Sequence, residues 1–183
     1  MDIERWAWAG QERYPGFCLS FVRDREPAAV AAALGAGSTA VMTLAEAEQA
    51  HPISERGALL RLGDRGPWTF CFEDRAPIAN RAPAIARLSQ DTRLLQVTKS
   101  GDGMVIVRDV VDGRKVEMFE PGTAPRAGAS LHPRIAALAG KHPAIVAALA
   151  VVGDEAGVDL DRDTLEGPLA TAWSTLNEPA VRR

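Results

Sequence analysis

The stretch "RLLQVTKSGDGMVIVRDVVDGRKVEMFEP", residues 93–121, decides the fold class. It contains three β-rich runs, and two turns separate them, Gly101-Asp102-Gly103 and Asp112-Gly113. Asp-Gly between two apolar runs is a typical signal of a two-residue hairpin turn. Links this short join antiparallel strands, because parallel strands need a crossover of a dozen residues or more. The stretch therefore predicts an antiparallel meander.

Further strands are predicted on the N-terminal side of this meander. "GFCLSFV" (16–22) is apolar and aromatic, as in a buried strand, and a brief strand is expected near residues 40–41. "ALLRL" (58–62) and "WTFCFE" (68–73) flank the turn residues 63–66, which predicts a hairpin. We expect a central antiparallel sheet of five to six strands.

Helices are predicted around this sheet from the signals at their ends. Residues 27–35 begin with proline and end with glycine, and Thr43 with Glu46 forms a capping-box pattern. After the loop "PGTAPRAG", helical patterns follow at 132–140, 142–157 and, more weakly, 161–176. Strands in the middle and helices at the end predict an α+β class with a helical C-terminal third.

Length and composition fit one domain. A chain of 183 residues suffices for one core and is short for two. We expect an N-terminal arm at 1–13, a single domain at 14–176 and a frayed tail at 177–183. The net charge is −3 and the arginines are scattered, which predicts no binding to nucleic acid or to an anionic membrane.

The expected location is the cytoplasm. No apolar run approaches the roughly 20 residues that a bilayer span needs, and "MDIERWAWAG" lacks the pattern of a signal peptide. Cys18 and Cys71 lie inside strand-like runs, so two reduced core thiols are expected rather than a disulfide. The histidines and cysteines have no metal-ligand spacing and no cofactor motif is present, so we expect neither a metal nor a cofactor.

Two glutamates are the candidate catalytic groups. Glu73 and Glu120 each end a strand after an aromatic residue. If the two strand ends lie together, the carboxylates could divide acid and base roles, and Arg126 in the following loop would anchor a carboxylate or phosphate. The alternative is that both glutamates are charged strand ends in solvent. The separation of Glu73 and Glu120 decides between these interpretations.

The two N-terminal tryptophans are candidates for another role. Trp6 and Trp8 project to the same side of an extended segment. They either pack onto the domain or form an aromatic anchor for a partner, since aromatic residues are common at interfaces.

The order of motifs resembles a known family. "GFCLSFVRDREPAAVAAALGA", "EAEQA", "WTFCFED", "DGRKVEMFEP…PRAGASLHP" and "AGVDLDRDTLEGPL" are similar, in order and spacing, to the uncharacterised, mainly actinobacterial family DUF6461. The resemblance covers roughly residues 14–170. It aligns these residues with recurring family positions: Cys18, Trp68, Glu73, Phe119, Glu120, Pro121, Arg126 and Gly128. The sequence departs from the family pattern at Asp24 and at Asp161-Arg162, both at expected helix starts.

The resemblance implies no established activity, cofactor or catalytic residue. By analogy, a small single domain with few motifs is similar to interaction modules and immunity-type proteins. Our first hypothesis is a cytoplasmic protein-binding module, an immunity-like or accessory factor with an unidentified protein partner. Its contact candidates are Trp6, Trp8, Glu120 and Arg126. The alternative is a small-ligand binder or enzyme that uses Glu73, Glu120 and Arg126, and the sequence leaves self-association open.

Overall fold

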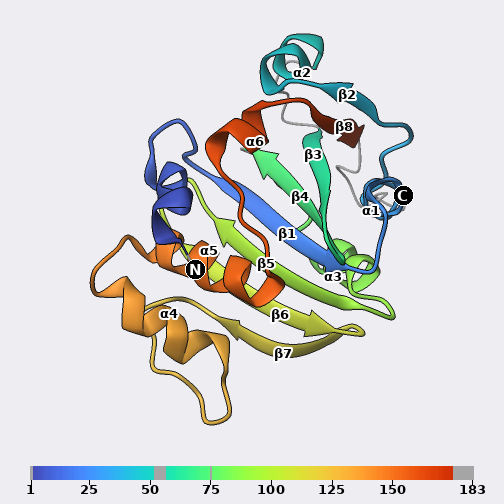
Figure 1. Ribbon diagram of the computed structural model, residues 1–183. Helices are drawn as coiled ribbons and strands as arrows, with labels where there is room; N and C mark the ends of the chain where they lie inside the picture. The colour runs from blue at the N-terminus through green and yellow to red at the C-terminus, as the bar shows by residue number, and fades with distance from the viewer. Residues whose placement is uncertain (1, 52–56, 75, 175–183) are drawn as a thin grey trace, which may run out of the picture.

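The computed structural model describes residues 2–51, 57–74 and 76–174 (Figure 1). The described residues form one antiparallel sheet of eight strands in the order β2-β8-β3-β4-β1-β5-β6-β7. The strands are β1 (Phe17–Arg23), β2 (Ala40–Met42), β3 (Ala58–Arg65), β4 (Trp68–Asp74), β5 (Arg93–Lys99), β6 (Val105–Val111), β7 (Arg114–Phe119) and β8 (Leu169–Ser174). The helices are the 3-10 helix η1 (Ile3–Gly10) and the α-helices α1 (Pro27–Ala33), α2 (Leu44–Ala50), α3 (Ala82–Leu88), α4 (Leu131–Ala139), α5 (Ala144–Ala156) and α6 (Arg162–Glu166).

The α+β class and the antiparallel pairing are confirmed, but the expected strand number was too low. The structure has eight strands where five to six were expected. The predicted helix at 161–176 is the clearest error, because only α6 is helical and β8 follows it. Gly167 and Pro168 end α6, since proline cannot continue a helix. Strand β8 then pairs with β3 on one side and β2 on the other, so long-range pairing decides its structure.

Several local predictions are confirmed. Asp112 and Gly113 both have positive φ, 47° and 71°, as a type I′ turn requires. The Thr43 hydroxyl accepts a hydrogen bond from the Glu46 backbone, and the Glu46 carboxylate accepts one from Thr43, which completes the capping box. Each of these signals lies within a few residues of chain, which explains why the sequence suffices to predict it.

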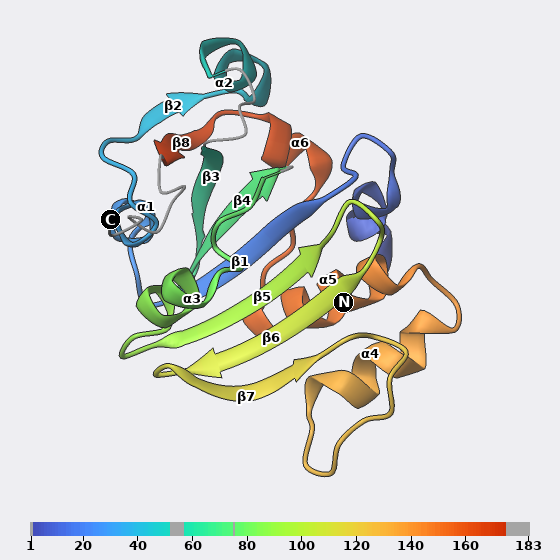
Figure 2. The ribbon, with the colours of Figure 1, turned by 180° about the vertical axis from the view of Figure 1, so that it is seen from behind.

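The sheet has two buried faces because side chains alternate along each strand. In β1, Phe17, Leu19 and Phe21 point to one side, and Cys18 and Val22 to the other. We call the first side the aromatic face; it carries η1, α4 and α5 (Figure 1). We call the second side the α3 face; it carries α1 and α3 (Figure 2).

The two N-terminal tryptophans pack into the core. Trp6 and Trp8 are 0% and 3% exposed, and η1, which carries them, packs on α5. The Trp8 indole donates a hydrogen bond to the Leu160 carbonyl at 3.0 Å, and its ring meets the Phe72 ring edge-on. Of the two alternatives for these residues, packing is the one found, and neither ring is available as a surface anchor. Residues 3–10 of the expected arm therefore contribute to the main core.

The remaining sequence expectations concern thiols, membranes, metals and the tail. Cys18 and Cys71 are free and buried, as predicted. No helix in the described part of the chain has the length and apolar character needed to cross a bilayer. Within the same residues, no cluster of three or more His, Cys, Asp or Glu side chains could hold a metal ion. The expected frayed tail at 177–183 lies outside the described residues.

Candidate functional site

The sheet ends at β7, and this strand has an open edge. In the described part of the chain it pairs only with β6, and most of its residues are exposed. Val116 and Met118 are 57% and 46% exposed, values that set them apart from the buried apolar side chains of the inner strands. Two more exposed apolar side chains, Met104 and Val111, lie in or beside the same hairpin. Apolar surface gathered at a strand edge is a typical mark of an interaction site.

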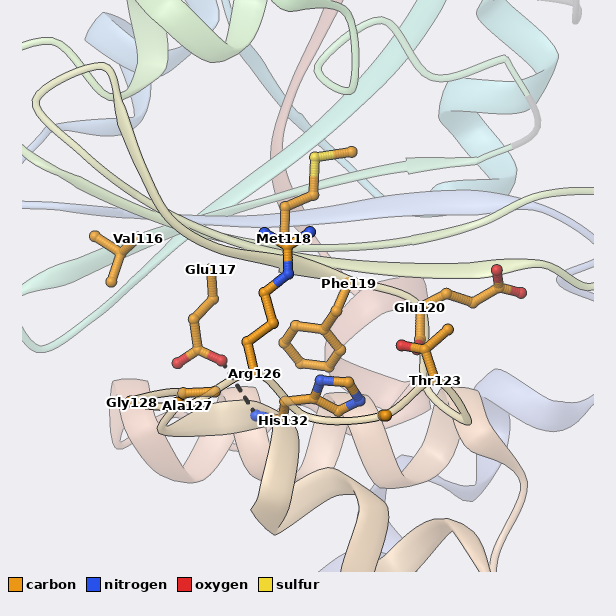
Figure 3. Close-up of a pocket in the computed structure, with 12 residues that line it drawn as sticks. Val116, Glu117, Met118, Phe119, Glu120, Thr123, Arg126, Ala127, Gly128 and His132 are labelled. Atoms are coloured by element: carbon orange, nitrogen blue, oxygen red, sulfur yellow. Dashed lines mark hydrogen bonds between the residues drawn. The ribbon is translucent and has the colours of Figure 1, made fainter.

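A cavity of about 480 Å³ lies along β7, and we call it the edge groove (Figure 3). Residues 116–120 form one wall, and loop residues between Thr123 and Ala129 form the other, with His132 at the start of α4. The volume lies in the range of ligand pockets, about 300–1,000 Å³. The groove thus follows the free edge of the strand.

Glu117 ties β7 to α4 and fixes the wall of the groove. Its carboxylate accepts hydrogen bonds from the backbone N–H groups of Ser130 (2.6 Å), Leu131 (3.0 Å) and His132 (3.3 Å). Partial burial acts to raise the pKa of Glu117, but these bonds and one from the Ser130 hydroxyl outweigh it. The pKa therefore lies below the usual glutamate value. An ionised Glu117 holds the first turn of the helix in place.

An aromatic stack supports the same wall. The rings of Phe119 and His132 are 4.0 Å apart between centroids and nearly parallel, at 9° (Figure 3). His132 is 2% exposed, and its Nε2 has no hydrogen-bond partner among the described residues. The stack therefore leaves one buried polar atom beside the groove.

Glu120 and Arg126 both belong to the edge groove. Both side chains are exposed and both line the edge groove, and Arg126 points from the loop toward β7 (Figure 3). Among the described residues, neither side chain has an ion-pair partner. The two charges are thus free to meet groups that enter the groove.

Glu73 does not join them. Strands β1, β5 and β6 separate β4 from β7, so four inter-strand spacings of about 4.8 Å put Glu73 about 19 Å from Glu120. Glu73 is 0% exposed on the α3 face, where its carboxylate accepts backbone N–H bonds from Ile78 (2.8 Å) and Ala79 (3.1 Å). Burial raises the pKa of Glu73 to about 7, against these hydrogen bonds. The proposed catalytic group of Glu73, Glu120 and Arg126 is therefore not assembled.

Sequence reasoning missed Lys115 and Met118 as neighbours. A β-bulge pairs Val110 with Lys115 and Asp109 with Glu117, which leaves Val116 as an extra residue. Lys115 and Met118 consequently line the same cavity on the α3 face, although a spacing of three residues would put them on opposite faces of a regular strand. The apolar residues of "KVEMF" next to charges are the only local signal of this exposed edge.

Comparisons with known proteins give one match. The model of a family described as a family of unknown function, DUF6461, matches residues 3–168 of the chain. No curated protein and no solved structure matches.

Proposed function

The chain belongs to this family of unknown function, and we propose that it is a protein-binding module. In this proposal an extended segment of a partner protein lies in the edge groove and adds a strand to β7. The observation that carries the proposal is an unpaired edge of six residues, Arg114–Phe119, with a groove along it. Strand addition of this kind takes its affinity from main-chain hydrogen bonds and its specificity from pockets for alternate side chains.

The backbone of β7 has hydrogen-bonding capacity left for a partner. Among the described residues, only β6 makes backbone hydrogen bonds with Arg114–Phe119. The type I′ turn makes Val111 and Arg114 a hydrogen-bonded pair, so Lys115 is in the next, non-bonded pair. The N–H and C=O of Lys115 therefore point away from β6, toward the open edge of the strand, directly before the groove residues 116–120.

The shape of the groove favours a single extended chain over a second folded copy. The edge of β7 forms one wall and the loop after it forms the other. A loop at this place obstructs the approach of a whole second sheet but leaves room for one strand. Val116 would contact apolar side chains of the segment, and Glu120 and Arg126 its polar ones.

The two thiols support action in a reducing compartment such as the cytoplasm, which is part of the proposal. Cys18 and Cys71 are fully buried without a disulfide, and burial raises the pKa of Cys18 to about 12. A thiol held protonated in the core is inert, so both residues fill space rather than react.

The test uses a displayed library of random 12-residue peptides selected on the full chain. Peptides that bind the chain should lose their binding to Lys115→Pro, because proline removes the outward N–H while the bonds to β6 remain. Lys115→Ala is the matched control: it removes the same charge, keeps the N–H, and should retain binding within about twofold.

Two outcomes contradict the proposal. One is a library that yields no binding peptide, and the other is a set of peptides that bind Lys115→Pro as well as Lys115→Ala. Light scattering of the free chain, which measures its oligomeric state, provides a third test. A dimer that Lys115→Pro dissociates would make a second copy the occupant of the edge, against the proposal of a partner segment.

A further inference from the structure

A second cavity, of about 340 Å³, lies on the α3 face between α3 and the β6–β7 hairpin, and we call it the α3 pocket. Its walls are apolar, formed by α3 side chains, Val110 and Met118. Its polar side chains are Asn80, Arg108 and Lys115, and none of the nine residues that line it is acidic. The pocket is therefore an apolar space with positive charge and no negative charge.

Arg108 is the buried cation of this pocket. It is 8% exposed, and its Nη1 donates hydrogen bonds to Gln96 Oε1 (3.1 Å) and Thr98 Oγ1 (3.2 Å). Gln96 in turn donates to Ser20 Oγ (3.0 Å) and to the Ala79 carbonyl (3.1 Å). This chain of bonds holds the guanidinium in one place, so a ligand would meet a preorganised donor.

The charge of Arg108 has no counter-charge in the described residues. Both of its acceptors are neutral, and no described carboxylate lies within the 4.0 Å of an ion pair. Both acceptors lie on β5, the neighbour of β6. Glu73, the buried acid of the same face, lies on β4, two strands beyond β5. Its carboxylate is bound by backbone N–H groups instead. Burial lowers the pKa of Arg108, yet a guanidinium stays charged in proteins.

Part of the guanidinium is open to the pocket. Nε and Nη2 of Arg108 make no hydrogen bond with the described residues, and neither is among the buried atoms that lack a partner. They are thus accessible, and Arg108 lines the pocket. Lys115, an exposed residue of β7, adds a second positive charge. An anion that binds there would supply the counter-charge and the hydrogen-bond acceptors that the buried guanidinium lacks.

We propose that the α3 pocket binds a small organic anion, with its carboxylate or phosphate on Arg108 and its apolar body against Val110, Met118 and α3. A planar guanidinium with two free donor atoms is suited to two parallel hydrogen bonds with either group. This site has Met118 in common with the lining of the edge groove, lies on the α3 face of the sheet, and needs no partner protein. It also differs from the expected ligand site, since it uses neither Glu120 nor Arg126.

Titrations of the full chain with hexanoate, hexyl phosphate, inorganic phosphate and neutral hexanamide test the proposal. Calorimetry and the side-chain Nε–H signal of Arg108 in NMR spectra report binding. We expect hexanoate or hexyl phosphate to bind and to shift the Arg108 signal, and hexanamide to leave it unchanged. The anion that binds with the higher affinity, hexanoate or hexyl phosphate, identifies the preferred head group. Binding of inorganic phosphate alone would contradict the proposal, because the apolar walls would then have no role.

Variants connect the binding to the pocket. Arg108→Met should weaken binding about tenfold to hundredfold, the worth of a hydrogen bond to a charged group. Arg114→Met is the matched control, because Arg114 is an exposed arginine of the same hairpin outside the pocket, and its affinity should equal that of the natural chain. Ala86→Trp fills the pocket from an exposed position of α3 and should also abolish binding without touching the core. Absence of binding by both anions, or binding that survives in Arg108→Met and Ala86→Trp, overturns the proposal.

Discussion

Two arginines are buried in the sheet, and their surroundings differ. Arg61 of β3 is 1% exposed and donates to the Met42 carbonyl (2.7 Å), the Thr171 hydroxyl (2.7 Å) and the carbonyls of Leu165 (3.1 Å) and Gly167. Arg108 of β6 is 8% exposed, donates to two neutral side chains, and lines an open pocket. Neither has a carboxylate partner among the described residues.

The difference separates a structural cation from one that is available for binding. Arg61 connects β2, β8 and α6, so its donors hold together segments that are far apart in the sequence. Burial lowers the pKa of Arg61 to about 10, and carbonyl and hydroxyl dipoles are its hydrogen-bond acceptors. Arg108 is nearly as buried as Arg61 but makes fewer hydrogen bonds, which is expected of a group whose partner binds from outside.

Arg61→Met should have the largest effect. The change leaves up to three backbone carbonyls and one hydroxyl without their donor, and each buried unsatisfied group costs about 1–3 kcal/mol before relaxation. We expect the free energy of unfolding to fall by about 3–5 kcal/mol, measured by urea denaturation. Arg65→Met, at an exposed position of the same strand, should change it by about 0.5 kcal/mol or less. A loss below about 1 kcal/mol for Arg61→Met would contradict a structural role.

Little of this contrast could be predicted from the sequence. The Asp112-Gly113 turn, the Thr43 capping box and the antiparallel meander depend on neighbours in the chain and were predicted correctly, but residues 63–65 of the expected turn at 63–66 belong to β3. Arg61 lies in "ALLRL", a run that predicts a strand. This run does not indicate the pairing with β8, and that pairing buries Arg61. Because the sequence does not indicate this pairing, the segment that forms β8 was predicted as a helix. Local signals thus define elements, and strand order decides which polar residues become buried.

The candidate site shows the same limit. Glu120 and Arg126 are six residues apart and line one groove because a short loop connects them. Glu73 was grouped with them on the likeness of two strand ends, yet four strand spacings separate the two glutamates. The bulge at Val116, which brings Lys115 and Met118 to one pocket, has no mark in the sequence.

Glu73→Gln tests whether Glu73 is ionised in the folded chain and could therefore balance the charge of Arg108 on the α3 face. The pKa of Glu73 is about 7 in the folded chain against an ordinary value of 4.5. The folded state therefore holds the extra proton, and stability is fully present below pH 4.5 and falls as the pH rises to 7. This difference in the pKa of Glu73 corresponds to a loss of about 3 kcal/mol at most in the free energy of unfolding.

The measurement is urea denaturation of both chains between pH 4 and pH 8. The natural chain should lose stability over this range, and Glu73→Gln should lose less, because glutamine carries no charge and keeps one acceptor oxygen for the backbone N–H groups of Ile78 and Ala79. At pH 8 the variant should be the more stable of the two. Parallel pH curves for the two chains would show that Glu73 is already ionised in the fold and available to balance Arg108.

Arg108→Met should have the smallest effect on stability, and it decides whether the two arginines differ as described. Gln96 and Thr98 lose a donor, which costs about 1–3 kcal/mol per buried acceptor. Removal of a desolvated charge that lacks a counter-ion stabilises the fold by a similar free energy. Apolar replacements of buried ions are often neutral or stabilising. We expect the free energy of unfolding to stay within about 1 kcal/mol of the natural chain in anion-free buffer. A loss as large as that of Arg61→Met would mean that Arg108 also holds the scaffold together, and the number of hydrogen bonds would then not distinguish a structural arginine from a binding one.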